Sequence, residues 1–421
     1  MSLNFSQRRE QFSTKFDYPL FVIALILSVF GTVMVYSGSV LVALKQGLDP
    51  QYYFVRQVIW VSIGMIAGYI AFRVNYRRLP QIAPFALGLV IFLLILVLII
   101  NWGEPIKRWL NLGFFDLQPS ELAKLVFLIY LSSWLSKHKE ITGSVADIIK
   151  GHFLKEVLPF LILLTSVSIL ILVEPDMDTT VILGLTSFLV YFISGNSILH
   201  ILGSFSVATL FTATFALATK FASYRLERFS NWYQFWINSS IQDPYGAGYQ
   251  LKQILVAVAS GGLFGVGFGE SRQKFHYLGE TAFSDTIFAI FAEEFGLIGC
   301  LILISAFFAL MYRGFAVARK AQDKLGFLIA ISITIWITLQ ATLHIASNVA
   351  LIPINGNTLP FISYGGSSTI VNLTAIGLLL NVSRVGDMRT HTRSRREPHV
   401  KRQRKKKLSI NPKNWITQMF D

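Results

Sequence analysis

Long blocks of apolar residues, with few or no charged side chains inside them, restrict the fold of this chain more than any other feature. A helix needs roughly 20 such residues to cross the hydrocarbon core of a bilayer. Hydrophobic residues make up 53% of the 421 residues and charged residues only 14%, which is unusual for a soluble globule. A β-barrel would show short alternating segments instead, so we expect an all-α polytopic membrane protein with about ten transmembrane helices. The predicted spans are residues 18–40, 58–72, 81–101, 125–135, 157–173, 179–194, 199–219, 286–312, 325–350 and 367–382.

The distribution of basic residues predicts the orientation of these spans. If the N-terminus is cytoplasmic, most of the Lys and Arg residues fall on the inner side, as the positive-inside rule requires. An even number of spans returns the C-terminus to that side. We see no cleavable signal, so the first span is expected to act as an uncleaved anchor. The predicted organisation is a cytoplasmic segment (1–17), a ten-helix membrane domain (18–383) and a basic cytoplasmic tail (384–421).

The tail carries most of the net charge of +14 and contains the run "RSRREPHVKRQRKKK". A basic run next to a membrane span more often meets anionic lipid headgroups than nucleic acid. Nothing else in the chain resembles a nucleic-acid-binding fold, so we expect anionic lipid or a cytoplasmic partner there. Cys300 is the only cysteine of the sequence, which excludes an intramolecular disulfide and a multi-cysteine metal site.

The largest connection, residues 220–285, faces outward in this orientation and lies between spans 7 and 8. Its part 248–269 is apolar and then glycine-rich, but it is too short to span, so we expect a re-entrant or interfacial segment. Gly265, Gly267 and Gly269 form a G-x-G-x-G pattern. A dinucleotide loop would need a preceding strand and a following soluble helix, so these glycines instead predict close packing of backbone.

Three acids stand in the stretch "GETAFSDTIFAIFAEEFG" (279–296). Asp285 is at the outer end of the eighth span, where its chemistry suits a helix cap and a catalytic carboxylate about equally well. Glu293 lies eight residues further on, about 12 Å along a helix axis, which is too far for a hydrolytic carboxylate pair. Glu293 and Glu294 are deep enough to need polar partners, so we interpret them as structural contacts.

Basic residues also gather on the predicted outer side, where positive charge is otherwise scarce. Lys107 and Arg108 precede Trp109, and an Arg fork with a Lys point charge suits a phosphate. The large loop contains four further basic residues: Arg225, Arg228, Arg272 and Lys274. Each is most simply interpreted as a solvated surface charge, but the outer cations taken together suggest a group around Asp285. The helix start "QPSE" is followed by Glu121 and Lys124 at i, i+3 spacing.

Several motifs, in the same order, resemble those of the SEDS family (shape, elongation, division and sporulation proteins). They are "KRW", "QPSELAK", "EPDMDT", "GESRQKFHYLG", "DTIFAIFAEEFGLIG" and "LPFISYGGSS". The resemblance runs from about residue 18 to residue 385. "SRQK" followed by a Tyr-Leu pair is more similar to the division branch of this family than to its elongation branch.

The resemblance implies a peptidoglycan glycosyltransferase that polymerises lipid II with Asp285 as the general base. The six outer cations are then candidates for binding the diphosphate. A divalent cation (Mg²⁺ or Mn²⁺) beside the diphosphate is left as an open alternative, and no residue is assigned as its ligand. The family implies a class B penicillin-binding protein and other division proteins as partners, and a location at the division septum. A lipid II flippase and a non-catalytic division scaffold are the alternatives. Expected supporting residues are Glu121, Lys124, Glu293, Ser363, Gly365 and Gly366.

The sequence departs from the family pattern at three places. "GETAFSD" replaces the usual "PEAHTD" before Asp285 and is one residue longer. Asp178 stands where the family has a glycine, and His344 stands where it has an asparagine. The first departure concerns the loop that carries the candidate base, so the local geometry there is the part least determined by the resemblance.

Overall fold

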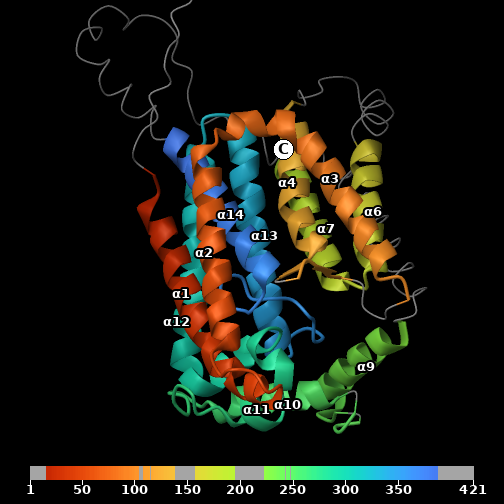
Figure 1. Cartoon of the computed structure of the whole chain (residues 1–421), viewed down its shortest axis with the longest axis vertical. Helices are drawn as coiled ribbons and strands as arrows, with labels where there is room; N and C mark the ends of the chain where they lie inside the picture. Colours follow the sequence, from red (N-terminus) through yellow and green to blue (C-terminus); the bar gives the residue numbers. More distant parts are fainter. Residues whose placement is uncertain are drawn as a thin grey trace, which may run out of the picture.

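The computed structural model describes residues 16–103, 108–113, 115–137, 157–194, 222–241, 243–246 and 248–386. This part of the chain is a bundle of long helices that run side by side (Figure 1). The main helices are α1 (Tyr18–Lys45), α2 (Tyr52–Arg73), α3 (Leu79–Ile100), α4 (Pro119–Lys137), α6 (Leu158–Val173), α7 (Met177–Ile193), α12 (Ile287–Lys320), α13 (Lys324–Asn348) and α14 (Gly366–Gly386). A short hairpin pairs β1 (Leu110–Asn111) antiparallel with β2 (Asp116–Leu117).

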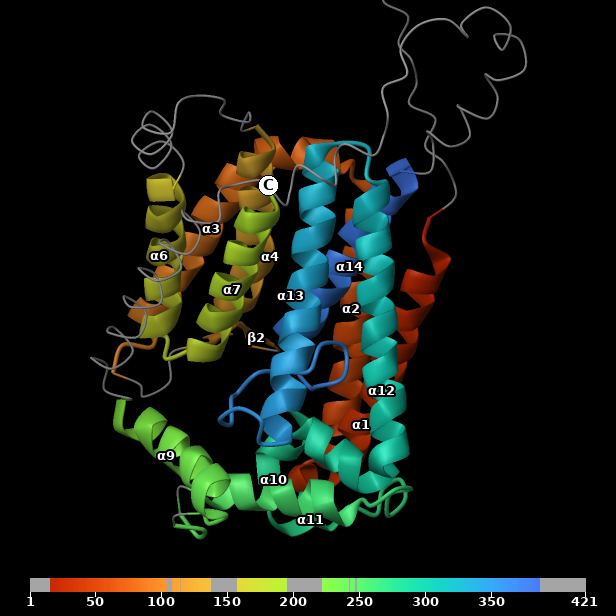
Figure 2. The ribbon, with the colours of Figure 1, turned by 180° about the vertical axis from the view of Figure 1, so that it is seen from behind.

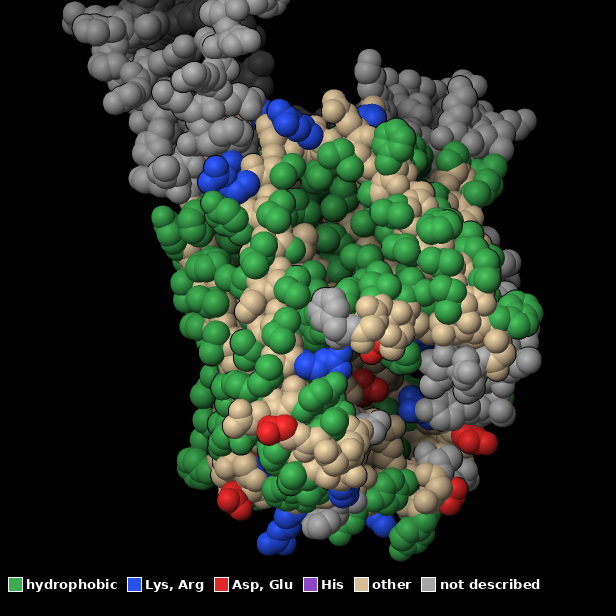
Figure 3. All heavy atoms as spheres, in the orientation of Figure 1, with side chains coloured by type: hydrophobic (Ala, Val, Ile, Leu, Met, Phe, Trp, Pro, Cys, Tyr) green, Lys and Arg blue, Asp and Glu red, His purple; other side chains and the backbone are tan. Residues whose placement is uncertain are grey.

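The all-α polytopic class predicted from the sequence is confirmed. Within the described residues, six helices are long and apolar enough to cross a membrane, namely α1, α2, α3 with the short turn η1 (Tyr76–Arg78), α12, α13 and α14. Helices α6 and α7 are shorter apolar helices. The predicted span at 199–219 lies outside the described residues. Hydrophobic side chains cover the middle of the face shown in Figure 3, and charged side chains appear toward its two ends.

Small residues allow the closest helix contact, between α2 and α14. A Cβ added to Gly377 would lie 2.0 Å from the carbonyl oxygen of Gly68, and one added to Gly68 would lie 2.7 Å from that of Leu373. Glycines at such positions let two backbones approach, which is how membrane helices gain packing without a hydrophobic driving force. This contact joins two helices about 300 residues apart in sequence, so it helps to close the bundle.

Shorter elements from the large connection cover one end of the bundle. They are α9 (Ala222–Asn238), α10 (Tyr249–Ser260), α11 (Arg272–His276) and η3 (Gly279–Phe283). Figure 2 shows α9, α10 and α11 at the lower end of the bundle. The indole nitrogens of Trp232 and Trp236 on α9 both donate to the carbonyl oxygen of Ala350, 2.8 and 2.7 Å away. This helix is therefore tied to the loop that follows α13.

The glycine-rich loop 261–269 packs backbone against backbone on α12. Helix α12 is interrupted at Gly296, which has φ of 64° and ψ of −167°. The carbonyl oxygens of Glu293 and Glu294 accept there from the amides of Val266 and Gly267, at 2.9 and 3.1 Å. The amide of Leu297 in turn donates to the carbonyl oxygen of Gly262. The loop thus satisfies backbone groups that the interruption releases, as buried polar backbone requires.

Gly265 shows why this loop needs glycine. It has a φ of +81°, and an added Cβ would lie only 2.1 Å from the carbonyl oxygen of Glu294. Any side chain would therefore push the loop off the helix. The expected close packing of backbone therefore holds at Gly265, whereas Gly267 and Gly269 have φ of +110° and +85°, a backbone conformation that favours glycine without a close contact.

Candidate active site

Asp285 lies in the connection between η3 and α12. The first helical residue is Ile287, and Thr286 occupies the N-cap position without a side-chain capping hydrogen bond. Asp285 therefore does not cap this helix, which removes the alternative left open by its sequence position. The side-chain Nδ2 of Asn348, at the end of α13, donates to the backbone carbonyl oxygen of Asp285 at 3.1 Å.

The loop after α13 holds the same connection from the other side. The hydroxyl of Ser363 donates to the carbonyl oxygen of Ser284 at 2.7 Å, and the amide of Tyr364 donates to that of Phe283 at 2.8 Å. The Ser363 hydroxyl also accepts from the amide of Leu359, 2.8 Å away. Residues from the end of α13 and from the loop after it thus fix the backbone that presents Asp285.

A second carboxylate, Asp178, faces the same place from the first turn of α7. Its Oδ2 accepts from the backbone amide of Gly356 at 2.8 Å. A Cβ added to Gly356 would lie 3.4 Å from Oδ2 of Asp178 and 3.6 Å from Oδ2 of Asp285. The two carboxylates therefore flank one glycine. From the sequence, Asp178 was only a departure from the family pattern and was not assigned to the site.

Two arginines face these acids. Arg108 Nε donates to the carbonyl oxygen of Glu174 at 3.2 Å, and its Nη2 donates to that of Pro175, so the guanidinium is held by the turn between α6 and α7. Arg228, on α9, donates from Nη1 to the carbonyl oxygen of Ile354 at 3.2 Å. Both positive charges act on Asp285 and on Asp178. Chain segments about 120 residues apart thus bring two of the predicted cations to the predicted acid.

The surroundings of Asp285 change its acidity. Burial raises the pKa of Asp285 to about 6, and the negative charge of Asp178 adds to this rise. A hydrogen bond from Ser284 and the charges of Arg108 and Arg228 act in the opposite direction. A carboxylate with a pKa near the operating pH is an effective proton acceptor. Figure 3 shows acidic side chains in a recess beyond the apolar band, with Lys or Arg on either side.

The other predicted cations are placed differently. Lys107 lies outside the described residues. Arg225 belongs to α9, but its side chain is not among those described. Arg272 begins α11 and its side chain is exposed.

Lys274 is buried in an internal ion pair and does not lie on the outer surface. Its Nζ is 2.5 Å from Oε1 of Glu294 and 2.7 Å from the hydroxyl of Ser37 on α1. Only 3% of the Lys274 side chain is exposed, and none of that of Glu294. The prediction that Lys274 is an outer cation was wrong; it followed from the rule that a basic residue in a large loop usually meets solvent. Here the loop folds inward and the charge is neutralised by the deep acid.

Glu293 also has a structural place. Its carboxylate accepts from the hydroxyl of Ser271 and from the backbone amides of Arg272 and Gln273. It thereby holds the first turn of α11, where backbone amides lack helical partners. Both deep acids are therefore engaged with α11, and neither reaches Asp285.

Comparison with known proteins identifies the family. A family model described as "Cell cycle protein", which covers FtsW, RodA and SpoVE, matches residues 18–387. The chain belongs to this FtsW/RodA/SpoVE family.

Two relatives illustrate the similarity within the FtsW/RodA/SpoVE family. The chain is 38% identical to "Probable peptidoglycan glycosyltransferase FtsW" of Nitrosomonas europaea over 87% of its own length and 92% of the relative's. It is 36% identical to "Stage V sporulation protein E" of Bacillus subtilis, over 87% and 97% of the two chains.

Solved structures agree with the fold. A structure described as "Structural coordination of polymerization and crosslinking by a peptidoglycan synthase complex" contains a chain that is 25% identical, with a TM-score of 0.68. The match covers 89% of this chain and 99% of that chain. A mutant of the Thermus thermophilus rod shape determining protein RodA has a TM-score of 0.62 at 24% identity, over 88% and 98%. The latter likeness concerns the fold alone.

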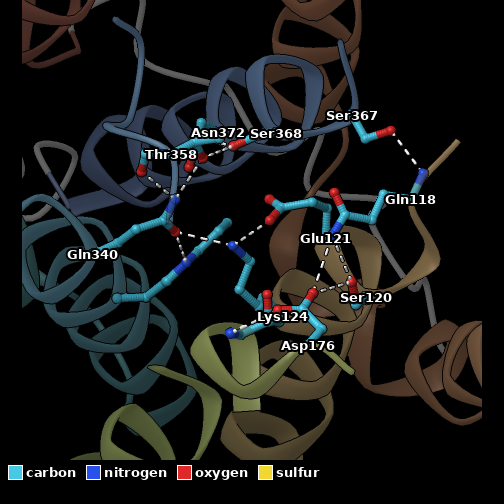
Figure 4. A network of polar contacts seen from close by, with 12 residues as sticks. Gln118, Ser120, Glu121, Lys124, Asp176, Gln340, Thr358, Ser367, Ser368 and Asn372 are labelled. Atoms are coloured by element: carbon cyan, nitrogen blue, oxygen red, sulfur yellow. Dashed lines mark hydrogen bonds and ion pairs between the residues drawn. The ribbon is translucent and has the colours of Figure 1, made fainter. Parts of the chain in front are cut away.

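In this member of the FtsW/RodA/SpoVE family, a buried polar network supports the site from α4 (Figure 4). Lys124 Nζ donates to Oε1 of Glu121 at 2.8 Å and to Oε1 of Gln340 on α13 at 3.0 Å. Gln340 Nε2 then donates to the carbonyl oxygen of Thr358 at 3.0 Å. The i, i+3 pair expected from the sequence therefore connects α4 to α13 and to the loop that carries Gly356.

A second branch of this network fixes the start of α7. Asp176 Oδ2 accepts from Gln118 and from Ser120, both at 3.0 Å, while its Oδ1 accepts from the amide of Thr179. Asp176 is the N-cap of α7, so this branch positions the helical turn that bears Asp178. Neither Asp176 nor Gln118 was assigned to the site from the sequence, because their role depends on contacts between separate segments.

The two expected glycines behave differently. A Cβ added to Gly366 would lie 3.0 Å from the indole ring of Trp60, so this glycine allows α14 to approach α2. A Cβ added to Gly365 would meet Ser368 at an ordinary 3.6 Å, so no close contact requires glycine there.

Among the residues that the structure describes, no group of three or more His, Cys, Asp or Glu is arranged to hold a metal ion.

Proposed function

We propose that this protein is a peptidoglycan glycosyltransferase that polymerises lipid II into glycan strands during cell division, at the outer face of the cytoplasmic membrane. The observation that carries the proposal is the convergence of Asp285 with Arg108 and Arg228. A proton acceptor beside two guanidinium groups suits a reaction that deprotonates a hydroxyl and releases a diphosphate. The relatives named as probable peptidoglycan glycosyltransferases support the same reaction.

Asp285 acts as the general base in this reaction. Its carboxylate takes the proton from the 4-hydroxyl of the incoming lipid II sugar. The hydroxyl oxygen then forms a bond to the anomeric carbon of the growing glycan, and the bond from that carbon to the diphosphate-lipid breaks. With a pKa of about 6, Asp285 is mostly ionised at neutral pH and can therefore accept a proton.

Arg108 and Arg228 stabilise the leaving diphosphate. Negative charge develops on that group in the transition state, and preorganised positive charge there lowers the barrier. Both side chains are held by backbone carbonyl oxygens, so little reorganisation is needed when the substrate binds. We retain Lys107, Arg225 and Arg272 as further candidates for attracting the anionic substrate. Lys274 is left out because it is committed to Glu294. A divalent cation, Mg²⁺ or Mn²⁺, is compatible with the diphosphate but is assigned no ligand.

The membrane arrangement that fits this function has ten spans with both termini in the cytoplasm. Asp285, α9 and α10 then belong to the outer surface, with segment 248–269 near the interface. The basic tail after residue 383 meets anionic lipid or a cytoplasmic partner. The protein is expected at the division septum.

A class B penicillin-binding protein is the proposed partner. The solved structure that resembles this chain is described as a peptidoglycan synthase complex that coordinates polymerization and crosslinking. A polymerase of this kind needs a transpeptidase to crosslink its product. Other division proteins are expected to join this pair at the septum.

The test compares Asp285→Asn with wild type in a glycan polymerisation assay, using purified protein, labelled lipid II and the cognate partner. Asp116→Asn serves as the control because Asp116 is an exposed acid outside the site. We expect Asp285→Asn to lose at least about 100-fold in rate, as general bases contribute roughly 10²–10⁴-fold, and the control to keep its rate. Polymer formed by Asp285→Asn at the wild-type rate would refute the assignment.

Two further measurements separate the alternatives. A flippase would move labelled lipid II from the inner leaflet of reconstituted liposomes, whether or not polymer forms. A non-catalytic scaffold predicts that cells with Asp285→Ala grow normally. We expect no growth with that variant when it is the only copy.

A further inference from the structure

We propose that Asp178 is a positioning residue that acts through Asp285, and that the two carboxylates, both next to Gly356, together determine the pH range in which the site accepts a proton. This inference rests on the proposed function. It concerns a residue that the common family pattern does not contain, because that pattern has glycine at this place.

The geometry places the two acids close together without a side chain between them. A Cβ on Gly356 would contact both carboxylates, at 3.4 Å for Asp178 and 3.6 Å for Asp285. The backbone amide of Gly356 donates to Asp178 at 2.8 Å and so fixes one carboxylate. The backbone of Asp285 is fixed separately, by the side-chain amide of Asn348.

Charged and titratable groups from several segments lie around this pair. Arg108, before β1, and Arg228, on α9, act on both acids and favour their ionised forms. Asp176, at the start of α7, adds negative charge beside Asp178. From α13, His344 places Nδ1 2.6 Å from the carbonyl oxygen of Asn357, the residue after Gly356.

The negative charge of Asp178 strengthens Asp285 as a base. When Asp285 accepts a proton, its repulsion with Asp178 disappears, so Asp178 makes proton uptake more favourable. Once a diphosphate engages the two arginines, less positive charge remains to offset this repulsion. The proton affinity of Asp285 therefore rises when the substrate is in place.

Asp178 departs from the pattern of the family, which usually has glycine at this place. Asp178 and His344 both depart from the pattern of the family, and they hold adjacent residues, Gly356 through its amide and Asn357 through its carbonyl oxygen. The two departures therefore meet in one loop segment. A glycine at 178 would have no carboxylate to hold that segment or to face Asp285.

The test is the pH dependence of kcat/KM for polymerisation in wild type, Asp178→Asn and Asp178→Gly. Asparagine keeps an oxygen that can accept from Gly356, but it removes the charge. We expect the acid limb of wild type to have a midpoint near pH 6, and that of Asp178→Asn to lie about one pH unit lower. Well above both midpoints, the rate of Asp178→Asn should be a few-fold lower than that of wild type, because a base of lower pKa accepts the proton less readily. Asp116→Asn, an exposed acid, should not move the midpoint.

A second readout does not depend on activity. A water-soluble carbodiimide reacts with protonated carboxyl groups, and peptide mass spectrometry measures its labelling of Asp285 as a function of pH. The midpoint of this labelling should fall by the same amount in Asp178→Asn and in Asp178→Gly. Coincident midpoints in wild type and Asp178→Asn, by either readout, would overturn the role of Asp178. A fully active Asp285→Asn would instead overturn the proposed function, so the two failures are distinct.

Discussion

The buried ion pair between Lys274 and Glu294 permits a quantitative prediction. The two charged atoms are 2.5 Å apart, and the side chains are 3% and 0% exposed. The Lys274 ammonium also donates to Ser37, so the pair joins α11 to α1 and α12. Replacing Lys274 by Met removes the positive charge and keeps the length of the side chain. It leaves the Glu294 carboxylate buried, with Ser37 as its remaining partner in these contacts.

The expected cost is large because a buried charge is left without its counter-charge. Removal of one partner of such a pair costs about 3–5 kcal/mol of folding free energy. Replacing both partners by apolar residues of similar volume is often neutral or stabilising. We therefore expect Lys274→Met to lose about 3–5 kcal/mol and the double variant Lys274→Met/Glu294→Met to recover most of that loss.

The assay is the free energy of unfolding of the purified protein in detergent micelles, measured by denaturant titration. Lys45→Met is the matched control, because Lys45 is an exposed lysine on α1 and its change should stay within about 0.5 kcal/mol. A loss below about 1 kcal/mol for Lys274→Met, together with a raised KM for lipid II, would refute the reasoning. Lys274 would then be a substrate-binding cation, as its position in the sequence first indicated.

Three further predictions concern other features. Gly265→Ala should destabilise the protein by several kcal/mol more than Gly269→Ala. Both glycines have positive φ, but a Cβ at Gly265 would lie 2.1 Å from a carbonyl oxygen, whereas a Cβ at Gly269 would meet open space. Thermal denaturation compares the two variants, and equal losses of stability would contradict the loop packing. Burial raises the pKa of Glu174 from 4.5 to about 10, so the folded state binds a proton that the unfolded state releases, and wild-type stability should fall as pH rises between these values. Glu174→Gln should lack that contribution. The free energy of unfolding of both proteins, measured at pH 6 and pH 8, tests this, and an equal change with pH in wild type and variant would contradict it. Arg228→Ala should lower kcat/KM for polymerisation at least about tenfold through the lost diphosphate contact, with partial recovery in Arg228→Lys; an unchanged value would remove Arg228 from the site.

The fold class and the outline of the site were accessible from the sequence. Uncharged apolar blocks must be helices in a bilayer, because no water is present there to satisfy open backbone groups. Asp285 and Arg108 stood out because polar residues at the ends of such blocks are few. The depth of Glu293 and Glu294 likewise predicted polar partners, since an unpaired carboxylate in that setting is costly.

The identities of those partners depended on contacts between distant segments. Lys274 and Glu294 are 20 residues apart, and only the inward fold of the loop brings them together. The same physics that makes a buried carboxylate costly draws a lysine inward to neutralise it. Sequence position alone placed that lysine in solvent, because it lies in the largest connection of the chain.

Asp178 shows most clearly which properties the sequence determines and which only the tertiary structure decides. From the sequence it was an acid in a turn where the family has glycine, with no sign of what it would face. Its relation to Asp285 arises because Gly356 has no side chain and lets two carboxylates approach, one from α7 and one from the connection before α12. Hydropathy and charge along the chain thus determined that the protein is a helical membrane protein with an acid and cations at one surface. The tertiary structure alone decided which charges meet, because electrostatic interaction depends on distance in space and the helices bring together residues more than 100 positions apart.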